Sequence, residues 1–201
     1  MTEHYYTQNP EVGHQLALIE VTLRGQALRL YTDRGVFSKK KVDFGTRLLV
    51  ETAELPKEGR IADVGCGYGP IGLAVAKESD RRQVFMVDIN CRAVKLARKN
   101  ARLNHIDNVM VKESDLLQAV KQYPFDAILS NPPIRAGKAT VFRLFEESYE
   151  ALKPGGVLWI VVQKKQGAPS AVKKLESLFE QVDEVEKKKG YRIIKAIKSS
   201  V

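Results

Sequence analysis

The chain has 201 residues, 44% of them hydrophobic, which is enough for one sizeable core and too little for two, so we predict a single domain, 1–201. Its longest apolar run, Val157 to Val162, is far shorter than the roughly 20 residues of a membrane-spanning helix, which argues against a membrane protein. Lys and Arg total 33 against 24 Asp and Glu, and the net charge of +9 favours polyanionic partners such as nucleic acid without identifying one.

The amino-terminal segment, Met1 to Pro10, is polar and aromatic. It lacks the apolar centre of a secretory signal, so we expect a cytoplasmic protein. Apolar and polar residues then alternate on both sides of a turn at Arg24, Gly25 and Gln26. This alternation predicts a β-hairpin near the amino terminus.

From Gly45 onward the pattern changes to short apolar runs separated by segments of helical period. The runs predict buried strands at 61–64, 84–89, 109–111, 127–129 and 157–162. The helices are predicted at 46–54, 70–79, 91–103, 140–152 and 170–180. Such alternation indicates a parallel α/β sheet, to which the tail adds strands at 182–185 and 191–197, joined by a turn at Gly190.

A glycine-rich turn follows the first of these strands, from Asp63 to Gly69, and leads directly into a helix that begins near Pro70. Glycines are needed where a ligand approaches the backbone more closely than a Cβ permits. The next strand ends in Asp88, at about the 20-residue distance that suits a carboxylate accepting both hydroxyls of a ribose. A dinucleotide site more often has the spacing G-x-G-x-x-G, whereas this turn reads D-x-G-x-G-x-G and resembles the first motif of class I methyltransferases.

That resemblance implies S-adenosyl-L-methionine as the cofactor and a Rossmann-like α/β fold. Its mostly parallel seven-stranded sheet would end in an antiparallel hairpin, with the amino-terminal β-hairpin as an extension. In that family the acidic residue that opens the motif, here Asp63, organises the loop around the amino-acid end of the cofactor. Asp115 matches the position that contacts the adenine amine, although it also suits a helix N-cap ahead of Leu116. The expected cofactor-binding residues are Asp63, Gly65, Cys66, Gly67, Gly69, Asp88, Ile89, Asp115 and Asn131.

The segment Ser130-Asn131-Pro132-Pro133-Ile134 ends the strand that begins near Asp126. Its prolines cannot extend a central strand, and they interrupt it at the carboxyl end, where open α/β sheets bind ligands. The segment resembles the Asn-Pro-Pro-aromatic motif of amino-methyltransferases that act on planar nitrogens. The Asn131 side-chain oxygen and the Pro132 carbonyl can each accept one amine hydrogen, which aligns the nitrogen with the sulfonium methyl group. We expect Asn131, Pro132, Pro133 and Ile134 to be catalytic, with no general-base histidine.

Ile134 departs from this motif, because many relatives carry an aromatic residue there that stacks on the flipped base. A lone aromatic residue, Phe37, is a candidate to close over the pocket instead, and it can equally be a core residue. Basic residues before the first motif and just past the catalytic turn are expected to contact phosphates near the target base. The expected substrate-binding residues are therefore Phe37, Lys39, Lys40, Arg135 and Lys138. Lys187 to Lys189 lie in a predicted turn and are expected to be solvated.

From about Tyr5 to Lys198 the chain resembles the bacterial small-domain methyltransferases that make N2-methylguanosine in small-subunit ribosomal RNA. The segment around Asp43 and Gly45-Thr46 matches the part of that family that flanks the cofactor pocket. We therefore expect 1–44 to form the hairpin and this flank, and 45–201 the cofactor-binding core. The resemblance implies ribosomal RNA or the small ribosomal subunit as the partner. Members commonly carry an additional amino-terminal half, for which these 201 residues offer no counterpart.

Other functions remain as alternatives. A protein glutamine is also a planar amide, but relatives that methylate it usually have Tyr where this chain has Ile134. Adenine-N6 methylation of DNA would require a separate target-recognition region, and a non-catalytic RNA-binding assembly factor would not need an intact Asn131 motif. Cys66 and Cys91 have no neighbouring Cys or His at a metal-ligand spacing, so we expect neither a disulfide nor a metal site. The sequence leaves the oligomeric state open.

Overall fold

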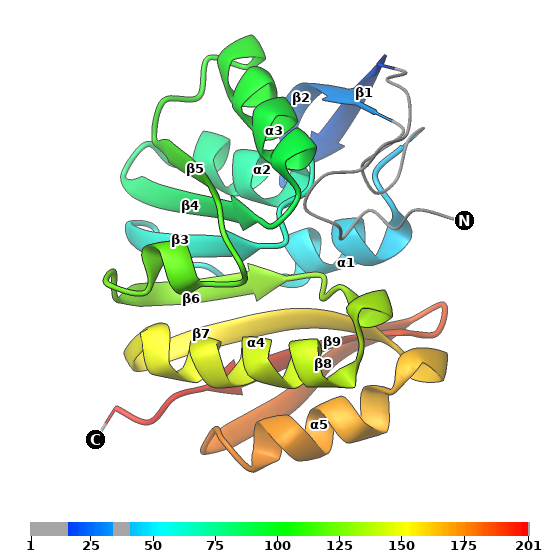
Figure 1. The fold of residues 1–201 in the computed structure, drawn as a ribbon, viewed down its shortest axis with the longest axis vertical. Helices are drawn as coiled ribbons and strands as arrows, with labels where there is room; N and C mark the ends of the chain where they lie inside the picture. The colour runs from blue at the N-terminus through cyan, green and yellow to red at the C-terminus, as the bar shows by residue number, and fades with distance from the viewer. Residues whose placement is uncertain (1–15, 34–40, 201) are drawn as a thin grey trace.

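The computed structural model describes residues 16–33 and 41–200, which form a seven-stranded sheet, a separate two-stranded sheet and five α-helices (Figure 1). In spatial order, the large sheet contains β5 (Val109–Glu113), β4 (Arg82–Asp88), β3 (Gly59–Val64), β6 (Phe125–Ser130), β7 (Leu152–Gln163), β9 (Tyr191–Ile197) and β8 (Gln181–Lys188). The first five run parallel, and β9 is antiparallel to both β7 and β8. The structure confirms the predicted α/β sheet and its antiparallel carboxyl-terminal hairpin.

Strand β3 is the point from which the sheet grows in two directions, because β4 pairs with one of its edges and β6 with the other. Along the sequence, β4 and β5 are placed successively on one side of β3, and β6 and β7 follow on the other side. The strand order therefore reverses between β3 and β6. Open α/β sheets bind their ligands at the carboxyl ends of the strands that flank such a reversal.

Helices bury both faces of the large sheet, which explains why its parallel strands are apolar runs rather than alternating ones. The helices of one face are α1 (Phe44–Thr52), α2 (Pro70–Glu78) and α3 (Cys91–Leu103), and those of the other are α4 (Lys138–Ala151) and α5 (Ala168–Glu176). Along β4, Val84 and Met86 pack with the first group of helices, while Phe85 and Val87 pack with the second. Helix α3 and the small sheet lie at one end of the molecule and α5 at the other (Figure 1).

The small sheet is the predicted amino-terminal hairpin, formed by β1 (Ala17–Leu23) and β2 (Gln26–Thr32). Its two turn residues, Arg24 and Gly25, have φ angles of 50° and 71°. Positive φ at both positions gives the tight turn whose twist matches that of the flanking strands.

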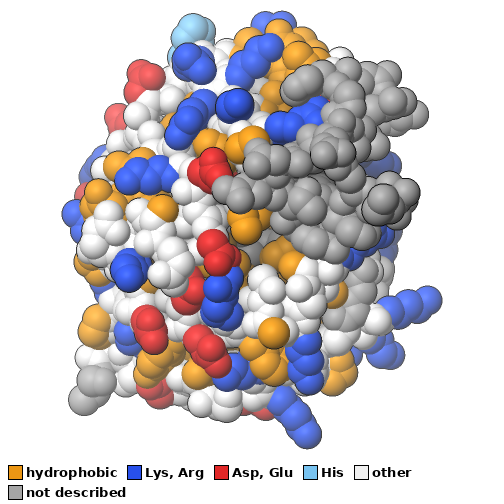
Figure 2. All heavy atoms as spheres, in the orientation of Figure 1, with side chains coloured by type: hydrophobic (Ala, Val, Ile, Leu, Met, Phe, Trp, Pro, Cys, Tyr) orange, Lys and Arg blue, Asp and Glu red, His pale blue; other side chains and the backbone are white. Residues whose placement is uncertain are grey.

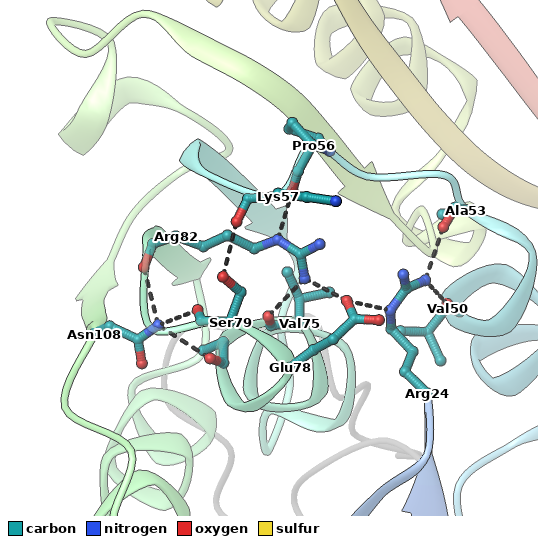
Figure 3. Close-up of polar contacts among 11 residues, drawn as sticks. Arg24, Val50, Ala53, Pro56, Lys57, Val75, Glu78, Ser79, Arg82 and Asn108 are labelled. Atoms are coloured by element: carbon teal, nitrogen blue, oxygen red, sulfur yellow. Dashed lines mark hydrogen bonds and ion pairs between the residues drawn. The ribbon is translucent and has the colours of Figure 1, made fainter.

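Polar contacts anchor this turn to α1 and α2 at the edge where β3 and β4 begin (Figure 3). The Arg24 guanidinium donates to the carbonyls of Val50 and Ala53, both at 2.7 Å, and to the Glu78 carboxylate at 2.9 Å. The same carboxylate oxygen accepts from Arg82, whose side chain is almost completely buried. Glu78 is therefore shared by two guanidinium groups, and it links the hairpin to the core.

Asn100 of α3 and Asn104, the C-cap of that helix, bind the backbone of β2 as a neighbouring strand would. Asn100 accepts from the Tyr31 amide at 2.7 Å and donates to the Tyr31 carbonyl at 2.9 Å. Asn104, one turn later, makes the same pair of contacts with Arg29 at 2.9 and 2.7 Å. Asn100 also donates to the Tyr68 carbonyl at 2.8 Å, which connects the hairpin to the glycine-rich turn. These contacts fix the hairpin beside the carboxyl end of β3.

Several element boundaries differ from the predicted ones. Helix α1 begins two residues earlier, because the Asp43 carboxylate caps it by accepting from the Thr46 amide at 3.0 Å. Strand β7 begins five residues earlier than predicted, at Leu152, because a register shift lets that residue pair with Phe125. Helix α3 and strand β9 have their predicted bounds. No helix within 16–33 and 41–200 is both long and apolar enough to cross a membrane.

Candidate active site

A cavity of about 350 Å³ opens at the carboxyl ends of β3, β4 and β6, where the strand order reverses. This volume is typical of small-molecule sites, which span roughly 300 to 1,000 Å³. The wall combines loops after four strands with the amino-terminal parts of α1, α2, α3 and α4. The lining residues are Asp43, Thr46, Val64, Gly65, Cys66, Gly67, Tyr68, Pro70, Ile71, Val87, Asp88, Ile89, Ala93, Ser114, Asp115, Leu116, Asn131, Pro133, Ala136, Thr140 and Arg143.

The glycine-rich turn forms one side of this cavity. The amides of Gly65 and Cys66 both donate to the Val87 carbonyl, at 2.8 and 3.0 Å, which ties the turn to β4. Gly65 has a φ of 74°, and a Cβ built there would meet no heavy atom within 4 Å. The backbone at Gly65 therefore borders open space, and a ligand can approach it closely.

Asp63 is not part of the cavity wall, although the sequence predicted it as a cofactor-binding residue. It is almost fully buried, and its Oδ2 accepts from the Gly72 amide in α2 at 2.8 Å. Among the described residues, its other oxygen has no hydrogen-bond partner. Burial raises the pKa of Asp63 to about 7, with the Gly72 amide opposing this rise and the charge of Asp88 adding to it. Asp63 therefore supports the turn from behind by holding the start of α2.

Asp88 lines the cavity at the end of β4, as predicted. Its two oxygens accept from the amides of Gly67 at 2.8 Å and Asn90 at 2.9 Å. Burial raises the pKa of this carboxyl to about 6, and these amides oppose the rise. Each carboxylate oxygen has two lone pairs, so Asp88 can accept further hydrogen bonds from hydroxyl groups in the cavity. Ile89, which is 36% exposed, follows it in the wall.

Asp115 also lines the cavity, and it forms an ion pair with Arg143 of α4. The Arg143 Nε lies 3.7 Å from Glu147, which accepts from the Leu117 amide at 3.0 Å. These contacts attach the loop after β5 to α4. Sequence reasoning missed Thr140 and Arg143 as lining residues, because they belong to no motif. Their i, i+3 spacing on one helix face was the available signal.

Asn131 lies in the cavity wall directly after β6. Its Nδ2 donates to the Thr46 hydroxyl at 3.0 Å, and Thr46 is itself almost fully buried in the first turn of α1. The side-chain oxygen is the acceptor of this amide, and the bond to Thr46 fixes its orientation. The Ser130 hydroxyl donates to the Val64 carbonyl at 2.7 Å, which holds this turn against β3.

The remaining residues of the turn are only partly arranged as expected. Pro133 lines the cavity, whereas Pro132 is buried behind it and Ile134 packs against the core beneath α4 and α5. The Pro132 carbonyl already accepts from the Ile134 amide at 2.8 Å. Arg135 and Lys138 are exposed and lie outside the wall, while Gly69 stands behind it as the N-cap of α2.

Three expected substrate-binding residues, Phe37, Lys39 and Lys40, lie outside the described residues. Cys66 is a buried thiol, and its burial raises the pKa well above the ordinary value. Across the described ranges, no three His, Cys, Asp or Glu side chains are grouped so as to hold a metal ion.

Comparison with known proteins identifies the family. The methyltransferase small domain family matches residues 27–195. The Bacillus subtilis (strain 168) protein YbxB is 54% identical over 200 residues, which are 98% of this chain and 100% of YbxB. The ribosomal RNA small subunit methyltransferase C of Haemophilus influenzae (strain 86-028NP) is 36% identical, and the match covers 68% of this chain and 42% of that protein.

Among solved structures, the T. thermophilus 16S rRNA N2 G1207 methyltransferase (RsmC), in complex with AdoMet and guanosine, is 25% identical with a TM-score of 0.81. That match covers 94% of this chain and 52% of the neighbour. The chain thus spans about half the length of the ribosomal RNA methyltransferases that it matches. The family match, the full-length similarity to YbxB and the fold agree, and the chain belongs to the methyltransferase small domain family.

Proposed function

We propose that this chain transfers the methyl group of S-adenosylmethionine to the N2 amine of a guanine in small-subunit ribosomal RNA. The observation that carries the proposal is the Asn131 side chain, which Thr46 holds at the cavity wall in an Asn-Pro-Pro turn. The similarity to a 16S rRNA N2 methyltransferase in complex with AdoMet and guanosine supports the guanine target. The net charge of +9 supports a polyanionic substrate.

S-adenosylmethionine is the cofactor, and the residues of the cavity suit its chemical groups. Asp88 supplies a carboxylate for the ribose hydroxyls, and Gly65 leaves open space beside its backbone. The Asp115 carboxylate is the acceptor for the adenine amine, and its pairing with Arg143 restricts its orientation. The apolar side chain of Ile89 offers a surface for the adenine ring. When bound, the cofactor supplies a sulfonium methyl group.

The chain's contribution to the reaction is alignment. A guanine amine is conjugated with its ring, and its lone pair becomes reactive only when the N–H bonds are held out of the ring plane. The Asn131 oxygen accepts one N–H, and the fixed amide orientation directs the nitrogen lone pair toward the methyl carbon. The N–C bond forms as the C–S bond breaks, and the methylated nitrogen then loses its extra proton to water. No strong base is needed before transfer.

The second acceptor in this proposal is the Pro132 carbonyl. It already accepts from the Ile134 amide, but a carbonyl oxygen has two lone pairs and can accept a second hydrogen bond. Because that local contact holds the turn, the carbonyl direction is set before the substrate binds. Asn131 remains the main acceptor, since its side chain lies in the wall while Pro132 lies behind it.

The experiment is transfer of tritium from labelled cofactor into ribosomal RNA, followed by nucleoside analysis of the product. Free small-subunit RNA, assembled small subunits and large-subunit RNA are offered separately. The proposal predicts labelled N2-methylguanosine in a small-subunit sample. Label confined to large-subunit RNA or to another nucleoside, or no label despite normal cofactor binding, would refute the proposed target.

A further inference from the structure

Two lysine pairs that are distant in sequence meet at the carboxyl end of β7, on the side of the sheet where the cavity opens. Lys164 and Lys165 begin the short helix η3 (Lys164–Gln166) directly after β7, while Lys188 ends β8 and Lys189 lies in the turn to β9. The Lys164 amide donates to the Gly190 carbonyl at 2.8 Å, which joins the two segments. We call these four lysines the lysine rim.

The strand pairing places the rim beyond the catalytic turn. Strand β6 ends at Ser130, which lies opposite Ile160 of β7, and Asn131 follows directly. Strand β7 continues to Gln163, which pairs with Tyr191 of β9. Three further residues at about 3.3 Å each raise the end of β7 on the order of 10 Å past the level at which β6 stops. The rim therefore lies next to the turn that contains Asn131 and extends beyond it.

Direct packing connects the rim to Asn131. The Lys189 Nζ lies 4.9 Å from the centre of the Phe44 ring, and that ring lies 5.5 Å from the ring of Tyr191. A Cβ added at Gly45 would come within 2.6 Å of the Tyr191 ring, so β9 packs tightly against the first turn of α1. The next residue, Thr46, holds Asn131. The rim and the catalytic amide thus contact the same helical turn.

The positive charges of the rim are not paired with carboxylates of the described residues. All four lysines are exposed, and none of them forms an ion pair with a carboxylate among the described residues. By contrast, the adjacent Lys187 lies 3.3 Å from Glu184. In Figure 2, Lys and Arg side chains project from the right-hand margin, where Figure 1 has the turn between β8 and β9. Solvation alone, as expected from the sequence for Lys187 to Lys189, does not explain why these charges gather at this edge.

We propose that the lysine rim binds the phosphates of the RNA strand that carries the target base. This inference rests on the proposed RNA substrate. A base that reaches Asn131 must leave its stack, and its own sugar-phosphate backbone then lies close to the edge of the cavity. Lysines at that edge release counterions from the strand on binding, and they set its path without reading its sequence.

The test replaces all four rim lysines by glutamine: Lys164→Gln, Lys165→Gln, Lys188→Gln and Lys189→Gln. The charge-matched control is Lys57→Gln, Lys99→Gln, Arg102→Gln and Lys121→Gln, at four exposed positions outside the rim. Binding of a fluorescent small-subunit ribosomal RNA fragment is measured by anisotropy over a series of KCl concentrations. Cofactor affinity is measured by calorimetry, and it reports whether the variants keep an intact cavity.

The rim variant is expected to bind RNA about 10-fold or more weakly than the control at about 0.1 M KCl. Its plot of log affinity against log salt should be shallower by about 0.7 for each phosphate that the variant no longer neutralises, with cofactor affinity unchanged. Equal affinity and equal salt slope in the two variants would refute RNA binding by the rim while leaving the proposed function intact. A wild-type chain that neither binds nor methylates ribosomal RNA would refute both.

Discussion

The Asn131 amide donates a 3.0 Å hydrogen bond to the Thr46 hydroxyl, which belongs to a helix that precedes it by 85 residues in the sequence. The orientation of the Asn131 amide is therefore determined by α1. Since Asp43 caps that helix and Tyr191 packs against Gly45, the capping residue, the helix and the β8–β9 hairpin all contribute to the position of one side chain.

Replacing Thr46 by valine keeps the shape of the side chain and removes the acceptor for Asn131. We expect kcat to fall by roughly 10- to 100-fold, because the amide is no longer held in the geometry that aligns the amine. The Kd for the cofactor should stay close to that of the wild type. Thr46→Ser retains the hydroxyl and should recover most of the turnover. A valine variant with wild-type kcat would show that the hydrogen bond has no role in positioning.

Replacing Gly45 by alanine forces the Tyr191 ring to move, because the new Cβ would lie 2.6 Å from it. We expect a loss of about 1 to 3 kcal/mol in the free energy of unfolding, as for other overpacked sites, together with a lower kcat. Urea unfolding measures the first effect and initial rates the second. In a Tyr191→Ala background only the Asp43 oxygen, at 3.3 Å, remains close to the new Cβ, and the same change should cost much less. An equal loss in both backgrounds would contradict the proposed steric cause.

The buried carboxyl of Asp63 predicts a dependence of stability on pH. Its pKa is about 7 in the folded protein and ordinarily 3.8, so the folded state binds the proton more tightly than the unfolded state does. This contribution to stability is fully present below about pH 3.8 and is lost as the pH rises through 7. Asp63→Asn should therefore flatten the decline of the unfolding free energy over this window. The exposed Asp107→Asn serves as a control and should keep the wild-type profile.

The carboxylate of Glu78 predicts the opposite dependence. Burial alone would raise its pKa, but the hydrogen bonds from Arg24 and Arg82 outweigh this effect and hold the pKa below the ordinary 4.5. Its stabilising contribution is present above pH 4.5 and is lost as the pH falls further. Glu78→Gln should lower the unfolding free energy by about 1 to 3 kcal/mol at pH 7 and by less in acid. Glu58→Gln, which breaks only the exposed pair with Arg81, should change it by less than about 1 kcal/mol.

The sequence predicted those parts of the fold and site that depend on local patterns. The bounds of helix α3 were predicted correctly because its apolar residues repeat with the helical period, and the structure adds that Asn90 caps it. The glycine-rich turn and the Asn131 turn are contiguous motifs, and residues of both line the cavity. The position of Asp88 at the edge of the sheet was predicted because it is the last residue of an apolar strand.

Features that depend on packing between distant segments were not predictable in this way. Thr46 was recognised as a flank of the pocket, but its bond to Asn131 depends on how α1 docks on the sheet. Arg143 reaches the cavity only because α4 runs beside the loop after β5. The turn at Gly190 was predicted, but its place on the side of the sheet that carries the cavity follows from the antiparallel pairing of β9 with β7. Asp63 was expected to organise the glycine-rich loop, but its bond to the Gly72 amide at the start of α2 depends on how that helix docks on the sheet.

The measurement that tests the central claim most directly compares Asn131→Ala with the wild type for methyl transfer to ribosomal RNA and for cofactor binding. If the Asn131 oxygen holds the amine, kcat should fall on the order of 100-fold or more, as when a preorganised hydrogen-bond partner of a reacting group is removed elsewhere. The Kd for S-adenosylmethionine should change little. An alanine variant that methylates guanine at the wild-type rate would contradict this account of the site.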